Sequence, residues 1–166
     1  MGERISVIGK KGMDIKMKKM LVVYYSWSNG NTKKIAEQLA DETGADIARI
    51  ETTEPYRGSH EDVVEQGKRE VEAGFMPQIN PLSVNLADYD VIAIGTPTWW
   101  YTMAPAVLTF LTTNDFTGKT VIPFMTNGGW PGHVMILSIL VDTFSSRISL
   151  TMPPSPKPHN TACVLS

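Results

Sequence analysis

The sequence has little cysteine, almost no excess charge and no long apolar run, and each shortage excludes a class of protein. Cys163 is the only cysteine among 166 residues, so neither an internal disulfide nor a cysteine-rich metal site can form. No apolar stretch approaches the ~20 residues of a membrane-spanning helix, and none follows the N-terminal lysines as in a secretory signal. The formal net charge of −2 gives no reason to expect nucleic-acid binding. We therefore expect a cytoplasmic protein that contacts neither membrane nor nucleic acid.

The remaining composition is that of an ordinary globular domain, with 42% hydrophobic and 19% charged residues. We divide the chain into three parts: residues 1–19 as a flexible leader, residues 20–152 as one domain, and residues 153–166 as an irregular proline-rich tail. A small extra strand near residues 5–8 is the alternative to a flexible leader. The sequence does not reveal the oligomeric state.

Short apolar runs alternate with amphipathic segments along the domain. The runs at 20–25, 46–50, 91–95 and 120–125 predict buried strands. The segments 31–43, 59–73 and 104–111 predict helices, and residues 147–152 could add a fifth strand. This alternation predicts an α/β fold, in which a parallel, doubly wound sheet lies between two layers of helices.

The most informative segment is MLVVYYSWSNGNTKKI, residues 20–35, where a strand, a tight turn and a helix start follow one another. Such a turn aims backbone N–H groups and the positive helix end at one point, which suits a phosphate. A P-loop needs more glycine and a Lys before its Ser/Thr, and a dinucleotide fingerprint needs three spaced glycines. A phospho-acceptor receiver domain needs acidic residues at the strand end, where this chain has Tyr24, Tyr25 and Ser26. The remaining alternative is an ordinary Ser/Asn-capped helix start.

Two further loops should meet the first at the carboxyl edge of the sheet, where doubly wound folds bind ligands. They are residues 96–104 (TPTWWYTMA) and 126–133 (TNGGWPGH), and they hold three of the four tryptophans. Large aromatic side chains on such loops favour a flat, phosphorylated, aromatic cofactor. Alternatively, Trp99 and Trp100 merely cover the end of the sheet.

These three motifs together resemble the flavodoxin family. Residues 26–32 (SWSNGNT) are similar to its phosphate loop with one residue inserted, and residues 95–100 (GTPTWW) and 127–130 (NGGW) resemble its two flavin-ring loops. The resemblance covers residues 20 to about 132 and implies FMN and a sheet of strand order 2-1-3-4-5. The family continues with a helix, a fifth strand and a final helix, whereas the four prolines between Pro153 and Pro158 forbid a regular closing helix. We therefore expect the C-terminus to be truncated or frame-shifted.

The resemblance also implies roles for residues. Ser26, Ser28, Asn31 and Thr32 would hold the phosphate. Thr98, Trp99, Trp100 and Tyr101 would line one side of the flavin ring, and Asn127, Gly128 and Gly129 the other. The full predicted cofactor site comprises Ser26, Ser28, Asn29, Gly30, Asn31, Thr32, Pro97, Thr98, Trp99, Trp100, Tyr101, Asn127, Gly128 and Gly129.

No residue is needed as nucleophile or general base, because FMN supplies the redox chemistry. The expected function is electron transfer between redox partner proteins, or to a small-molecule acceptor. The alternative is an NAD(P)H-dependent FMN quinone or nitro reductase, and the fold cannot separate the two. A chain of this length leaves no room for a nicotinamide domain, which favours the carrier.

Overall fold

The computed structural model describes residues 18–127, and these form the predicted parallel α/β sheet. Its strands lie in the order β2-β1-β3-β5, with a short β4 bonded antiparallel to the end of β3. Counting only the four predicted strands, this is the expected order 2-1-3-4. The elements are β1 (Met20–Tyr24), α1 (Asn31–Thr43), β2 (Asp46–Arg49), α2 (His60–Glu72), the 3₁₀ turn η1 (Leu86–Asp88), β3 (Val91–Trp99), β4 (Thr102–Met103), α3 (Pro105–Thr113) and β5 (Thr120–Thr126).

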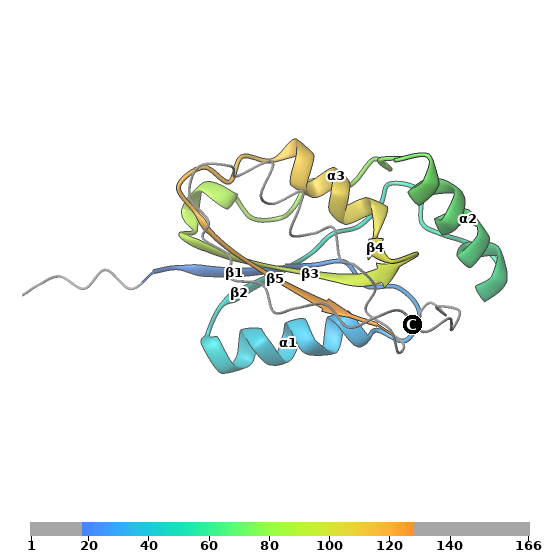
Figure 1. Cartoon of the computed structure of the whole chain (residues 1–166). Coiled ribbons are helices and arrows are strands. Elements are labelled where there is room, and N and C mark those ends of the chain that lie inside the picture. The colour runs from blue at the N-terminus through green and yellow to red at the C-terminus, as the bar shows by residue number, and fades with distance from the viewer. Residues whose placement is uncertain (1–17, 128–166) are drawn as a thin grey trace, which may run out of the picture.

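Helices cover the sheet on both faces. In Figure 1, α1 lies below the sheet, α3 lies above it, and α2 lies beyond the end of β3, next to β4. Successive residues of β1 point to opposite faces, so Leu21 and Val23 pack toward α3 whereas Val22 packs toward α1. Both faces of this strand are therefore buried, which explains why its sequence is continuously apolar.

Helix α1 has the predicted bounds and contacts the sheet through a narrow face. Thr32, Ala36 and Ala40 are buried at i, i+4 spacing, whereas Ile35 is 45% exposed. Small side chains let the helix lie close to the strands, so the contacting stripe is too narrow to include Ile35. Gly44 ends the helix in a left-handed conformation.

Strand β3 is longer than predicted, because residues 96–99 continue it instead of forming a loop. Thr98 pairs with Met103 and Trp99 with Thr102, which makes a hairpin with β4. Its two-residue turn has Trp100 at φ 46 and Tyr101 at φ 67. Hairpin turns in which both residues have positive φ normally use Asn or Gly. Nothing in the local sequence therefore predicted a hairpin here. The Thr96 hydroxyl stabilises the open end of the hairpin, where it accepts the Ala104 N–H at 3.0 Å.

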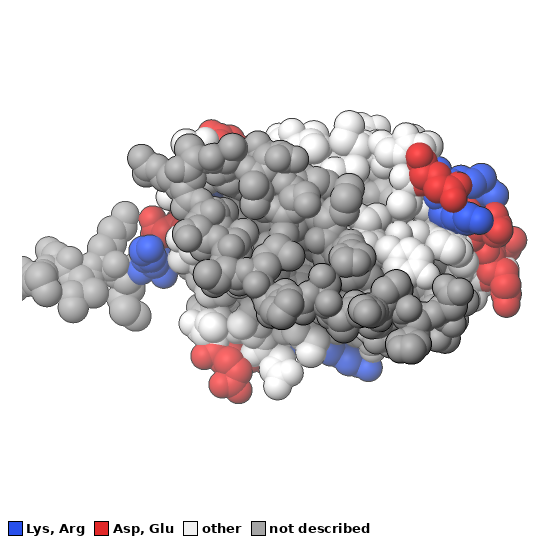
Figure 2. All heavy atoms as spheres, viewed as in Figure 1, with Lys and Arg blue, Asp and Glu red and all other residues white. Residues whose placement is uncertain are grey.

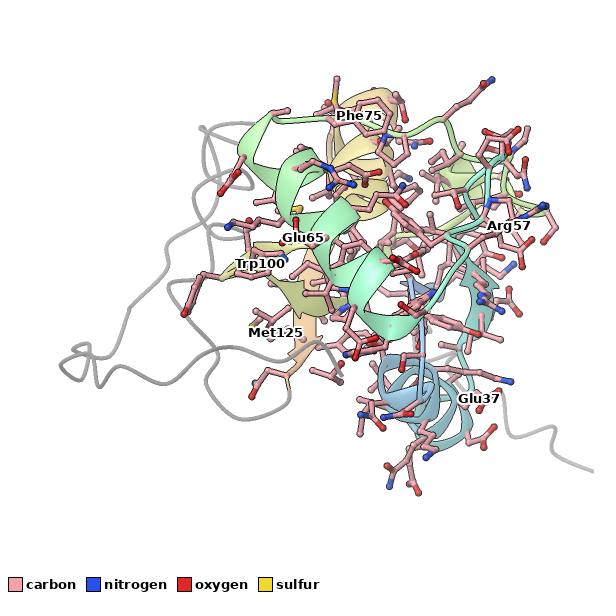
Figure 3. The ribbon with its side chains drawn as sticks, turned by 90° about the vertical axis from the view of Figure 1, so that its right-hand side faces the viewer. Glu37, Arg57, Glu65, Phe75, Trp100 and Met125 are labelled. Atoms are coloured by element: carbon pink, nitrogen blue, oxygen red, sulfur yellow. The ribbon has the colours of Figure 1, made fainter. Side chains whose placement is uncertain are left out.

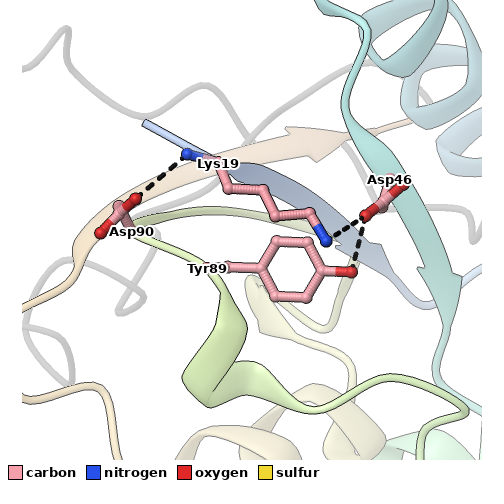
Figure 4. Close-up of polar contacts among 4 residues, drawn as sticks. All are labelled: Lys19, Asp46, Tyr89 and Asp90. Atoms are coloured by element: carbon pink, nitrogen blue, oxygen red, sulfur yellow. Dashed lines mark hydrogen bonds and ion pairs between the residues drawn. The ribbon is translucent and has the colours of Figure 1, made fainter. Parts of the chain in front are cut away.

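Strand β1 begins at Met20, as predicted, but hydrogen bonds continue one residue before it, to Lys19. The Lys19 carbonyl accepts the N–H of Asp90 at 2.9 Å, and its own N–H donates to the Asp90 carboxylate at 3.1 Å. Its ammonium lies 3.1 Å from Asp46 Oδ2, which also accepts the Tyr89 hydroxyl at 2.8 Å (Figure 4). The hydrogen bond from the Tyr89 hydroxyl lowers the pKa of the Asp46 carboxyl most, and the hydrogen bond and charge of Lys19 lower it further. Lys19 is thus attached to the sheet and does not belong to a flexible leader.

Several predicted features lie outside the described residues: most of the leader, Gly128 and Gly129, the possible fifth strand at 147–152, and the proline-rich tail. Between residues 18 and 127, no helix combines the length and the apolar character needed to cross a membrane.

Candidate functional site

The loop after β1 leaves the start of α1 open to a ligand. Gly30 precedes the helix at φ 72, no side chain between residues 18 and 127 caps the first N–H groups, and the first turn contains no acidic residue. Ser28 is also left-handed, at φ 57. A helix start without a cap leaves N–H groups in need of an acceptor and carries partial positive charge. The ordinary capped helix start, our alternative for this segment, is therefore not what the structure shows.

Two buried hydroxyl groups near this loop have no hydrogen-bond partner within the described part of the chain. They are Ser26 Oγ, on a residue 5% exposed, and Thr98 Oγ1, on a residue 7% exposed. Ser26 follows β1, and Thr98 lies near the end of the neighbouring parallel strand β3, whose register pairs Tyr24 with Gly95. An unpaired buried hydroxyl costs about 1–3 kcal/mol, so two of them at one sheet edge indicate that a polar ligand completes the site.

The end of β5 reaches the same place. Thr32 Oγ1, at the start of α1, lies 2.8 Å from Thr126 Oγ1, the last residue of β5. Thr32 is almost fully buried, and Asn127 directly follows this contact. The predicted meeting of the first and third loops is thus confirmed at Thr126, the first residue of the third loop.

The aromatic side chains of the predicted flavin loop are placed very differently from one another. Trp99 is 1% exposed and lies edge-on to the rings of Tyr56, Tyr25 and Trp27, at centroid distances of 5.0, 5.9 and 6.3 Å. Gly67 of α2 makes room for it, because a Cβ there would lie 3.0 Å from the Trp99 ring. Trp99 therefore belongs to the core and presents no open ring face.

Trp100 and Tyr101 lie at the tip of the hairpin. The Trp100 indole donates to the Val64 carbonyl of α2 at 3.0 Å, and Lys68 Nζ lies 5.4 Å from its ring centroid. Figure 3 shows Trp100 beside the middle of α2. Tyr101, in contrast, is 42% exposed. The hairpin thus anchors one aromatic side chain on α2 and leaves the next one open to solvent.

Sequence reasoning missed two neighbours of the phosphate loop. Arg49, the last residue of β2, donates from Nη2 to the Ser26 carbonyl at 3.2 Å. His60, the first residue of α2, stacks on Trp27 at a centroid distance of 5.7 Å and an interplanar angle of 24°. Arg49 could have been found, because β2 was predicted beside β1 and the ends of neighbouring parallel strands meet. The His60 contact depends on where α2 lies, and no sequence pattern signals it.

Comparison with known proteins gives one family and several similar structures. The model of a family described as Flavodoxin matches residues 19–135. A candidate flavoprotein from Bacteroides eggerthii is 31% identical, with a TM-score of 0.69, over 78% of this chain and 82% of that one. A flavoprotein in complex with FMN from Lactobacillus acidophilus is 26% identical, with a TM-score of 0.65, over 76% and 86% of the two chains. No curated protein matches the chain.

Proposed function

The chain belongs to the flavodoxin family, and from this premise we propose that it binds FMN at the carboxyl edge of its sheet and carries electrons between redox partners. FMN is the cofactor that the family match and the similar FMN complex from Lactobacillus acidophilus support. When bound, FMN supplies the redox chemistry, and the protein sets its binding, orientation and potential.

The observation that carries the proposal is the unfilled hydrogen-bonding capacity around the start of α1. Among the described residues, no side chain caps the helix, and the buried Ser26 and Thr98 hydroxyls have no partner. A phosphate would accept from the N–H groups of the first turn and from the hydroxyls of Ser26 and Thr32. Thr98, on the neighbouring strand, would then bond a polar group of the same cofactor further along the sheet edge.

The aromatic residues divide into supporting and contacting ones. We propose that Tyr101, which is exposed, contacts the flavin ring, and that Trp100 holds the hairpin in place through its bond to Val64. Trp99 supports the strand end from the core. The buried end of β3 would also exclude water from one side of the site. Asn127, together with Gly128 and Gly129, remains the proposed second wall.

Acidic residues predominate on α2. The helix carries Glu61, Asp62, Glu65, Glu70 and Glu72 but only two Lys or Arg residues, Lys68 and Arg69. Figure 2 shows side chains of both signs at the edge of the molecule where α2 lies, and Arg69 pairs with Glu65 at 3.6 Å. We propose that a partner docks through the exposed aromatic tip near Tyr101.

The test has two stages. The apoprotein is titrated with FMN and with riboflavin, which lacks the phosphate; FMN should bind far more tightly, and equal affinities contradict the phosphate site. The FMN-loaded protein is then reduced stepwise while its visible spectrum is recorded. One-electron steps support the carrier, whereas a direct two-electron reduction, together with fast bleaching by NADPH, supports the reductase alternative.

A further inference from the structure

Strand β1 is hydrogen-bonded to β2 up to the point where the phosphate loop, residues 26–32, begins. The last of these bonds runs from the Ile50 N–H to the Tyr24 carbonyl, at 2.7 Å. Because the bonds of a parallel ladder recur at even spacing, the next one would join the Thr52 N–H to the Ser26 carbonyl. The ladder therefore predicts a backbone partner from the β2 side for the first residue of the loop.

That ladder bond is missing, because the chain turns away from β1 after β2. Thr52 instead forms an antiparallel bridge with Ile79, and the neighbouring Glu51 carbonyl accepts the Asn80 N–H at 2.8 Å. Ser26 is only 5% exposed, and a buried carbonyl without a hydrogen bond is costly. The Ser26 carbonyl must therefore be satisfied by another group.

The Arg49 side chain takes the place of the missing bond. Its Nη2 donates to the Ser26 carbonyl at 3.2 Å. Its Nη1 lies 3.9 Å from the Glu51 carboxylate, and both side chains are half-exposed. The charge of the guanidinium is thus balanced by a neighbour and open to water, which leaves it little attraction for a distant anion. The main effect of Arg49 is to fix the direction of one peptide group.

The peptide between Ser26 and Trp27 is trans, so its carbonyl and its N–H point in opposite directions. Since the carbonyl points toward Arg49, the Trp27 N–H points away from it, and this N–H has no partner among the described residues. The Trp27 ring, which stacks on His60 and lies edge-on to Trp99, holds the next residue in place. If the peptide turned over, a carbonyl oxygen would replace the free N–H, and a carbonyl oxygen repels a phosphate.

We propose that Arg49 is a positioning residue for the flavin phosphate: it holds the Ser26 carbonyl on the β2 side, so that the Trp27 N–H faces the phosphate. The inference rests on the proposed function, because it requires the phosphate to lie in this loop. Arg49 itself does not contact the cofactor. Riboflavin has no phosphate, so Arg49 should set the preference for FMN over riboflavin and leave the affinity for the flavin ring unchanged.

The experiment compares Arg49→Met with the matched control Arg57→Met. Arg49→Met keeps the aliphatic stem of the side chain and removes its N–H donors. Arg57→Met makes the same change at an exposed arginine of the segment after β2, which has no hydrogen bond or ion pair with another described residue. FMN and riboflavin are titrated separately into each apoprotein and into the unmodified one. Circular dichroism checks that both variants fold.

Arg49→Met should weaken FMN binding by about three- to tenfold, less than the loss of a whole hydrogen bond to the phosphate would cause. Riboflavin binding should not change, and Arg57→Met should affect neither flavin. If Arg49→Met weakens both flavins equally, or weakens neither, the positioning role is wrong while the proposed function stands. If the unmodified chain does not prefer FMN to riboflavin, the proposed function itself fails.

Two further measurements separate positioning from attraction by positive charge. Glu51→Gln leaves the Arg49 charge unbalanced, so attraction predicts tighter FMN binding, whereas positioning predicts no gain. In amide NMR spectra, the Trp27 N–H signal should move downfield with FMN but not with riboflavin, and the movement should be smaller in Arg49→Met. Tighter FMN binding by Glu51→Gln, or a Trp27 signal that responds to both flavins alike, would overturn the inference.

Discussion

The Thr32 hydroxyl contacts Thr126 of the sheet and, in our proposal, donates to the FMN phosphate. Thr32→Val tests both hydrogen bonds. Thr32 is almost fully buried, and its Oγ1 lies 2.8 Å from Thr126 Oγ1. One hydroxyl can accept a hydrogen from Thr126 while it donates its own to a phosphate. Valine keeps the shape of the side chain and removes both bonds.

The size of the effect follows from the two kinds of bond. A hydrogen bond to a charged group contributes about 1.5–3 kcal/mol, and a neutral one contributes about 1 kcal/mol. Thr32→Val should therefore weaken FMN binding by about 10- to 100-fold. Thr126→Val breaks the same neutral bond but leaves the Thr32 hydroxyl in place, so it should weaken FMN binding by less than about fivefold. Both variants should lose about 1 kcal/mol of stability without cofactor.

Affinity is measured from the quenching of flavin fluorescence at pH 7, and stability from urea unfolding of the apoprotein. The expected pattern is a large difference in affinity between two variants of equal stability. If Thr126→Val weakens FMN as much as Thr32→Val does, the hydroxyl acts only through the fold, and its assignment as a phosphate donor is refuted.

Three further predictions concern the core, the Lys19–Asp46 ion pair and the hairpin. Gly95→Ala would place a Cβ 2.3 Å from the Phe124 ring, and urea unfolding should show a loss of about 1–3 kcal/mol; unchanged stability would contradict this packing. Asp46→Asn should destabilise the protein above pH 3.8, the ordinary pKa of Asp. Because the folded-state pKa of Asp46 is lowered, its contribution is lost as the pH falls through that lower pKa, so the unfolding curves of variant and parent should converge in acid; a constant difference contradicts the ion pair. Trp100→Phe loses the indole donor to α2 and should loosen FMN by about three- to tenfold, whereas Trp99→Phe, measured in the same titration, should mainly lower stability; the reverse result would exchange their roles.

Most of the fold was predictable because its signals are local. The continuous apolar run at 20–25 and the segment 59–73 predicted elements close to the observed bounds of β1 and α2. The end of β3 was not predictable in this way. Residues 96–99 continue the strand because β4 pairs with them and β5 follows β3 as far as Pro97. The left-handed turn at Trp100 and Tyr101 has no residue that prefers such a conformation, so tertiary contacts select it.

The candidate site likewise has one part that local sequence predicts and another that only the tertiary structure decides. By itself, the sequence determined the strand–turn–helix segment and its hydroxyls, because an apolar run followed by Ser, Asn and Gly has few other ways to fold. Only the tertiary structure decided which tryptophan is buried, since α2 packs on Trp99 through Gly67 and bonds Trp100 through Val64. It also brought Arg49 and Glu51 to the phosphate loop, because parallel pairing of β1 with β2 joins residues that lie some 20 positions apart in the chain.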